Sequence, residues 1–113
     1  MSPIIEETLD GIVLAIPSDS LSGANVAGFR KELEGLARGP QLKVLVDLSL
    51  VQFIDSAACS ALLQFHNQRQ ARGGRVVVCC ASASVRALFE LVRMQRVLDL
   101  YPSRDAALAA LKG

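Results

Sequence analysis

The stretch VLVDLSLVQFIDS, residues 44–56, decides the fold of this chain. Its first five residues form a nearly continuous apolar run, which is typical of a strand covered on both faces of a sheet. A second run of this type is VVVCC, residues 76–80. The segment between them, residues 56–72, has helical spacing and is closed by Gly73 and Gly74. Two buried strands joined by a helix predict a parallel β-α-β unit.

The sequence before residue 44 predicts a β-hairpin followed by a helix. Short apolar runs at residues 4–8 and 12–16 are separated by a turn containing Asp10-Gly11, in which glycine supplies the positive φ of a tight turn. Pro17 ends the second strand because it has no amide hydrogen to donate to a ladder. The helix that follows ends at Arg38-Gly39-Pro40, and its apolar stripe consists of Val26, Phe29, Leu33 and Leu36.

The sequence after residue 80 predicts a short helix, a short strand and a final helix. The short helix carries Val85, Leu88, Phe89 and Val92. The strand covers residues 97–100, and Ser103 or Asp105 caps a last helix that carries Ala107, Leu108 and Leu111. In the helix predicted at residues 56–72, we expect one face to carry Cys59, Leu62, Leu63, His66 and Gln70.

The complete order, β-β-α-β-α-β-α-β-α, predicts a single α/β domain over residues 1–113. A hairpin followed by alternating helices and buried strands implies a small, mixed, mostly parallel β-sheet flanked by about four α-helices. A chain of 113 residues suits one core better than two. Because 51% of the residues are hydrophobic and only 4% are aromatic, the core is expected to be aliphatic.

Charge and hydropathy exclude several classes of protein. The formal net charge is +1, with 12 basic and 11 acidic residues mixed along the chain, which argues against a nucleic-acid-binding face. No apolar run approaches the ~20 residues of a membrane span. Met1-Ser2-Pro3 leads directly into the first predicted strand, without a signal peptide. The cysteines, Cys59, Cys79 and Cys80, are odd in number and include an adjacent pair, which suits thiols in a reducing cytoplasm.

No set of residues in the sequence resembles an active site. His66 is the sole histidine and is expected to be a packing or surface residue in mid-helix. Asp10 and Asp47 are expected to be loop or cap acids, and Cys79 and Cys80 to be small core residues of a strand. The metal-binding spacings Cys-x-x-Cys and His-x-x-x-His and the phosphate-binding loop are absent. We therefore expect no enzyme, no catalytic residue, no metal and no cofactor.

The most informative stretch is FIDSAACS, residues 53–60, in which an apolar segment ends in Asp55-Ser56 and a helix of small residues begins. One interpretation is simple capping, in which Asp55 or Ser56 accepts hydrogen bonds from the first amides of the helix. The other is that the Ser56 hydroxyl carries a phosphate. The helix amides and dipole would favour that anion, whereas the adjacent Asp55 would repel it.

Several blocks of the chain, taken in order, resemble the STAS domain, the family named for sulfate transporters and anti-sigma factor antagonists. The resemblance covers roughly residues 4–111. It runs through VLVDLS (44–49), FIDS (53–56), Leu62-Leu63 with ARGG (71–74), VVVC (76–79) and SVRALFEL (84–91). It implies a small sheet flanked by helices, in agreement with the element order above.

The resemblance also implies a function. In bacterial antagonists of this family, the hydroxyl residue after the aspartate of the Asp-Ser motif is phosphorylated, and that residue is Ser56 here. The unphosphorylated antagonist captures an anti-sigma factor and frees the sigma factor. This anti-sigma factor is an ATP-dependent serine kinase with a histidine-kinase-like ATPase fold, and a metal-dependent serine/threonine phosphatase removes the phosphate. The implied partner-binding residues are Asp19, Ser20, Leu21, Asp55, Ser56, Ala57, Ala58, Cys59 and Leu62.

Three positions depart from the usual family pattern. Ala57-Ala58-Cys59 replaces a second hydroxyl residue followed by Gly-Leu, so Ser56 is the only hydroxyl in the first turn. Ser18-Asp19-Ser20-Leu21 replaces Gly-x-Leu-Asp, and Arg93 stands where a glycine usually ends the third helix. Two alternative functions stay open: a cytoplasmic STAS subunit of an ABC-type membrane transporter, and a scaffold in a signalling assembly.

Overall fold

Two antiparallel strands, β1 (Ile4–Leu9) and β2 (Ile12–Pro17), form a hairpin in the computed structural model, which describes residues 4–39 and 43–112. Between them, Asp10 and Gly11 have positive φ angles of 52° and 77°, the combination that a two-residue hairpin turn of type I′ requires. The hairpin predicted from the Asp-Gly pair is therefore confirmed, and Pro17 is the last residue of β2.

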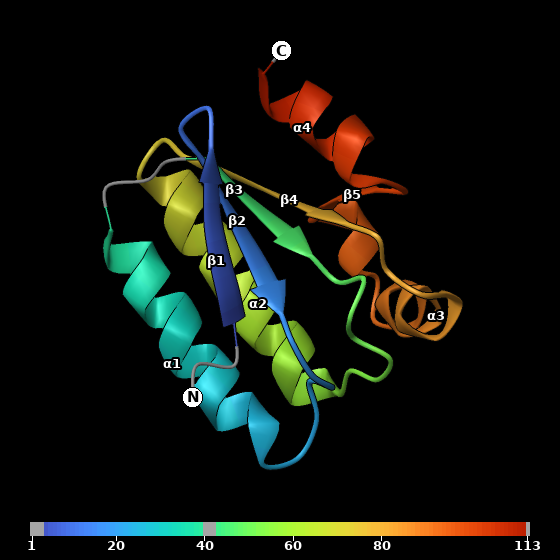
Figure 1. The fold of residues 1–113 in the computed structure, drawn as a ribbon. Helices are drawn as coiled ribbons and strands as arrows, with labels where there is room; N and C mark the ends of the chain where they lie inside the picture. Colours follow the sequence, from blue (N-terminus) through green and yellow to red (C-terminus); the bar gives the residue numbers. More distant parts are fainter. Residues whose placement is uncertain (1–3, 40–42, 113) are drawn as a thin grey trace.

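Three further strands extend the hairpin into a five-stranded sheet with the order β1-β2-β3-β4-β5 (Figure 1). They are β3 (Lys43–Asp47), β4 (Arg75–Cys79) and β5 (Asp99–Tyr101), and β2 to β5 all run parallel. Val44 of the central strand pairs with Val13 on one side and Val76 on the other. The sheet is mixed and mostly parallel, as the element order predicts.

Helices cover both faces of this sheet, which is why its strands read as continuous apolar runs. One face packs against α1 (Asn25–Arg38), α2 (Ser56–Ala71) and α3 (Ala83–Leu91). The other face packs against α4 (Arg104–Lys112) (Figure 1). The alternate side chains of β2, β3 and β4 are thus buried in two separate cores, whereas β1 is exposed after Ile4.

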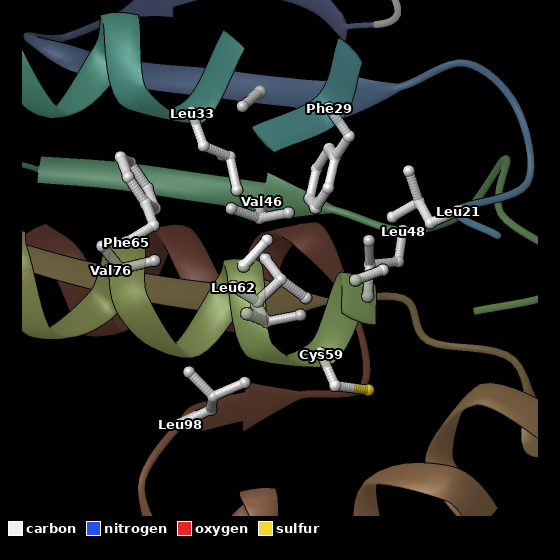
Figure 2. Packing of buried hydrophobic residues seen from close by; sticks show 14 of the residues in the cluster. Leu21, Phe29, Leu33, Val46, Leu48, Cys59, Leu62, Phe65, Val76 and Leu98 are labelled. Carbon is white, nitrogen blue, oxygen red and sulfur yellow. The ribbon is translucent and has the colours of Figure 1, made fainter. Parts of the chain in front are cut away.

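The larger core lies between the sheet and α1 to α3. Around Val46 of β3, side chains from α1 and α2 meet (Figure 2): Phe29, Leu33, Leu62 and Phe65. The smaller core lies under α4 and contains Ile12, Leu14, Leu45, Val77, Cys79, Ala107 and Leu111. Both cores are mainly aliphatic, as the composition predicts.

The strands differ from the predicted ranges by one or two residues at several ends; β3, for example, is Lys43–Asp47 rather than residues 44–48. β4 ends at Cys79, because Cys80 has a positive φ of 64° that breaks the ladder, and Cys80 is only half-buried. β5 begins at Asp99 rather than at residue 97. The chain before it forms a 3-10 turn, η1 (Met94–Arg96), and leaves Val97 exposed.

The buried face of α2 also differs from the predicted stripe. Gln70 is exposed, whereas the neighbouring Arg69 is fully buried. The Arg69 guanidinium donates hydrogen bonds to the carbonyl oxygens of Ala37 and Gly39, at the end of α1. Charged side chains are seldom buried without partners. Here the last carbonyl groups of α1 supply them, and His66 is buried in the same helix as a packing residue.

The helix ends agree with the sequence in most respects. α1 ends at Arg38 with Gly39 as its C-cap, while Pro40 and Met1-Ser2-Pro3 lie outside the described residues. At the start of α4, Ser103 Oγ accepts the amide hydrogen of Ala106 at 3.1 Å, so Ser103 is the cap rather than Asp105. Within the described ranges, no helix is both long and apolar enough to cross a membrane.

Candidate functional site

Asp55 is the N-cap residue of α2. Its Oδ1 atom accepts the amide hydrogen of Ala58 at 2.9 Å, and its Oδ2 atom accepts that of Gly23 at 3.1 Å. These two hydrogen bonds, first from Ala58 and then from Gly23, hold the pKa of the Asp55 carboxyl below its usual value. The side chain is therefore ionised at neutral pH, and the cap is supplied by Asp55 rather than by Ser56.

The loop before α1 is fastened to this cap. Leu21 forms an isolated parallel bridge with Ile54. In this bridge the Leu21 amide donates to the Phe53 carbonyl at 2.8 Å, and the Asp55 amide donates to the Leu21 carbonyl at 2.9 Å. Together with the bond from Gly23, these contacts hold the loop of residues 18–24 beside the first turn of α2.

Ser56 is the first residue of α2 and is exposed. The amide groups of the first turn and the positive end of the helix dipole favour an anion at this end of the helix. Ala57 is also exposed, and so is Ser60, one turn further along the helix. The exposure of Ser56 leaves its hydroxyl within reach of a modifying enzyme.

A shallow groove of about 220 Å³ lies beside Ser56. It runs between α2 and the segment after α3 and is lined by Ser56, Cys59, Ser60, Leu63, Val92 and Met94. Phe53, three residues before Ser56, is 63% exposed, and Val92 is 43% exposed. Exposed apolar side chains around a groove are typical of surfaces that bind other proteins.

The residues predicted to bind a partner fall into two groups. One group is exposed or half-buried: Asp19, Ser20, Asp55, Ser56 and Ala57. The other group has exposed fractions of 4% or less: Leu21, Ala58, Cys59 and Leu62. Because the second group faces the larger core, the expectation that its side chains present themselves to a partner is corrected. They support the surface from beneath.

Cys59 illustrates this supporting role. Burial, with a smaller contribution from the charge of Asp55, raises the pKa of the Cys59 thiol to about 11. The thiol is therefore protonated at neutral pH, where a thiolate would be needed for reactivity. Cys59 packs in the core and forms part of the groove floor.

Sequence reasoning missed three residues of this surface: Phe53, Val92 and Arg30. Arg30 of α1 reaches the start of α2, where its Nη2 atom donates to the carbonyl oxygen of Ala57 at 3.5 Å. Apolar periodicity assigns residues such as Phe53 and Val92 to a core. The position of Arg30 depends on the contact between α1 and α2, for which a single sequence carries no signal.

Asp47, expected to be a loop or cap acid, is instead a buried member of an ion pair. Its Oδ2 atom accepts hydrogen bonds from Arg104, at 3.0 Å from Nε and 2.6 Å from Nη2, and Oδ1 accepts the Ser49 amide hydrogen at 2.8 Å. Burial opposes ionisation, but the bonds from Ser49 and Arg104 outweigh it and lower the pKa of Asp47. The Asp47 carboxylate and the sulfur atoms of Cys79 and Cys80 lie within 4.8 Å of one another.

The chain matches known proteins over almost its whole length. A family model described as STAS domain matches residues 3–107. A relative from Bordetella bronchiseptica, BtrV, named as a candidate anti-sigma factor antagonist, is 27% identical over 106 residues, which are 94% of this chain and 91% of the relative.

Solved structures share the fold. The crystal structure of a candidate anti-sigma factor antagonist from Thermotoga maritima has a TM-score of 0.91 at 19% identity and covers 97% of this chain and 95% of its own. The phosphorylated form of the Bacillus cell fate determinant SpoIIAA has a TM-score of 0.70 at 16% identity, with coverage of 95% and 97%.

Proposed function

Because this chain belongs to the STAS domain family, we propose that it is an anti-sigma factor antagonist that is switched by phosphorylation of Ser56. The unphosphorylated chain binds an anti-sigma factor serine kinase in the cytoplasm and thereby releases a sigma factor. Phosphorylation by that kinase ends the binding, and a metal-dependent serine/threonine phosphatase restores it. The chain itself acts by binding and not by catalysis.

The position of Ser56 carries this proposal. The hydroxyl residue is exposed at the start of α2, directly after a carboxylate that already caps the helix. A phosphate on Ser56 would therefore leave the cap, and with it the fold, in place. The names of the relatives from Bordetella and Thermotoga support the antagonist function, and the phosphorylated form of SpoIIAA supports the modification.

The physical basis of the switch is the cost of burying charge. A phosphoserine adds a charge of about −1.5 to −2, beside the ionised Asp55. A partner that packs against Phe53 and Val92 would have to remove this charge from water without a matching cation, which is strongly unfavourable. Each loss of about 1.4 kcal/mol lowers the affinity tenfold, so a modest mismatch is sufficient.

The test is the intact mass of the full chain after incubation with a purified anti-sigma factor kinase and ATP. We expect the wild type to gain one phosphate and Ser56→Ala to gain none. Ser60→Ala, at the exposed serine one turn further, is the matched control and should gain the phosphate. A phosphate on Ser56→Ala would overturn the assignment of the residue. Firm binding to the kinase without any phosphate would replace the switch with a constitutive adaptor.

A further inference from the structure

Cys79 and Cys80 form a pair of adjacent thiols at the end of β4, on the face of the sheet that α4 covers. Their sulfur atoms are 3.3 Å apart and are not joined in a disulfide. This pair lies on the opposite face of the sheet from α2 and plays no part in the proposed switch. We propose that Cys79 and Cys80 form a binding site for trivalent arsenic, in which both sulfur atoms bond to the same arsenic atom.

The backbone brings the two sulfur atoms together. In a regular strand, successive side chains point to opposite faces, so adjacent cysteines would be separated by the sheet. The left-handed conformation of Cys80, with φ of 64°, breaks this alternation. Such a conformation is unfavourable in a residue other than glycine.

Hydrogen bonds fix this arrangement. The Cys79 carbonyl accepts the Leu48 amide hydrogen at 3.0 Å, and the Cys80 amide donates to the Tyr101 carbonyl at 3.2 Å. Because both cysteines are held by neighbouring segments, little conformational freedom is lost when their sulfur atoms bind a common atom. The thiols are thus preorganised as a pair.

The separation of the sulfur atoms favours arsenic over zinc. If each sulfur bonds to one atom at about 2.3 Å, the length of a zinc–thiolate bond, a separation of 3.3 Å gives an angle of about 92° at that atom. A tetrahedral zinc ion needs about 109°, with sulfur atoms about 3.8 Å apart. Trivalent arsenic carries a lone pair that compresses its bond angles towards a right angle, which fits the observed separation.

The surrounding charges favour a neutral ligand. Asp47 is the nearby carboxylate, and both of its oxygen atoms already accept hydrogen bonds from Arg104 and Ser49. A divalent cation would lie against the Arg104 guanidinium and compete with it for Asp47. Burial raises the pKa of the Cys79 thiol, which also disfavours the thiolates that a cation requires.

The reaction of a trivalent arsenical with the two thiols involves only neutral species. Arsenous acid and two thiols give two As–S bonds and release two molecules of water, with no change in oxidation state. Phenylarsine oxide and two thiols likewise give two As–S bonds and release one molecule of water. Cys79 is buried but Cys80 is half-buried, so the reagent reaches Cys80 first and the second bond closes inwards on Cys79.

Phenylarsine oxide is the probe, added in equimolar amount to the reduced full chain and followed by intact mass. We expect one phenylarsenic group per chain, retained in excess glutathione, a monothiol, but removed by 2,3-dimercaptopropanol, a dithiol. Cys80→Ser should weaken this binding by at least about tenfold. Cys59→Ser, which removes the thiol in the other core, should bind like the wild type. Circular dichroism establishes that both variants are folded.

Three results would overturn the proposal. The first is undiminished binding by folded Cys80→Ser, and the second is loss of binding by folded Cys59→Ser. The third is displacement of the arsenical by an equal concentration of Zn²⁺, which would make the pair a cation site. None of these outcomes depends on a kinase, so they leave the proposed switch at Ser56 untouched.

Discussion

The carboxylate of Asp55 accepts the amide hydrogen of Gly23, 32 residues earlier in the chain, at 3.1 Å, while it caps α2 through Ala58. One side chain therefore fixes both the start of the helix that carries Ser56 and the loop beside it. Any partner that approaches Ser56 meets two segments whose relative position is set by this carboxylate.

Replacement of Asp55 should loosen this arrangement. We expect Asp55→Ala to lower the free energy of unfolding by about 1–2 kcal/mol, since it removes the helix cap. Asp55→Asn keeps one acceptor oxygen for the cap, so it should lower the free energy of unfolding by about half as much. Urea denaturation at pH 7 measures both values. Equal losses in the two variants would show that the cap contributes little.

The Asp47–Arg104 pair predicts a dependence of stability on pH. The pKa of Asp47 is lowered in the folded chain, so its stabilising contribution is present above the unfolded pKa of about 3.9 and is lost as the pH falls below it. Asp47→Asn should reduce this loss of stability at low pH. At pH 7 it should lower the free energy of unfolding by about 2 kcal/mol, because Arg104 loses its charged partner.

Asp99 supplies the matched control for this prediction. Its ion pair with Arg75 is open to water, with both side chains 44% exposed. Asp99→Asn should therefore change the stability at pH 7 by less than about 1 kcal/mol. Melting temperatures of the wild type, Asp47→Asn and Asp99→Asn are measured between pH 2 and 7. If Asp47→Asn loses stability at low pH as steeply as the wild type does, Asp47 is not the group responsible.

Arg69 and Arg72 donate to the same carbonyl oxygen, that of Ala37, but only Arg69 is buried. Arg69→Ala leaves a cavity and removes buried hydrogen bonds to the end of α1. We therefore expect it to lower the free energy of unfolding by about 3 kcal/mol. Arg72→Ala leaves this carbonyl oxygen with its hydrogen bond from Arg69 and should lower the free energy of unfolding by less than about 1 kcal/mol. Chemical denaturation ranks the two variants, and the reverse order would refute the role of burial.

Arg93 adopts a left-handed conformation, with φ of 62°, at the position where the family resemblance leads us to expect glycine. Glycine has no steric penalty there, so Arg93→Gly should raise the free energy of unfolding by about 1 kcal/mol and the melting temperature by about 4 °C. Arg93→Ala keeps the penalty and should give no such gain. A melting temperature that rises equally in both variants would assign the effect to the lost charge.

A negative charge at residue 56 should weaken binding to the anti-sigma factor. Ser56→Asp should weaken binding by at least about tenfold, which corresponds to about 1.4 kcal/mol. Ser56→Asn has nearly the same size without the charge, and it should bind close to the wild type. Isothermal titration calorimetry with a non-hydrolysable ATP analogue avoids phosphorylation during the measurement. Equal weakening by Asn would point to shape rather than charge.

Local chemistry made much of the fold predictable. The hairpin follows from Asp10-Gly11, since both residues take the positive φ that this turn needs. The buried strands follow from their continuous apolar runs, and the start of α2 follows from Asp55-Ser56. In each case, neighbouring residues carry the whole signal.

Long-range contacts made the rest unpredictable from one sequence. Arg69 is buried because the end of α1 happens to meet it, and Asp47 is buried because Arg104 lies 57 residues away in the chain but beside it in space. For the site, the half-buried Asp55 and the exposed Ser56 were predictable as a motif. The exposure of Phe53 was not, because an apolar residue before a helix is usually in the core.

The strand order β1-β2-β3-β4-β5 has a consequence for synthesis on the ribosome. Each strand pairs with the one made just before it, so the sheet grows from one edge as the chain emerges. Its second face has no cover until α4, which follows all five strands in the chain, has emerged. Until then Leu14, Leu45 and Val77 are open to water. A nascent chain stalled before residue 104 would therefore be a client for a chaperone.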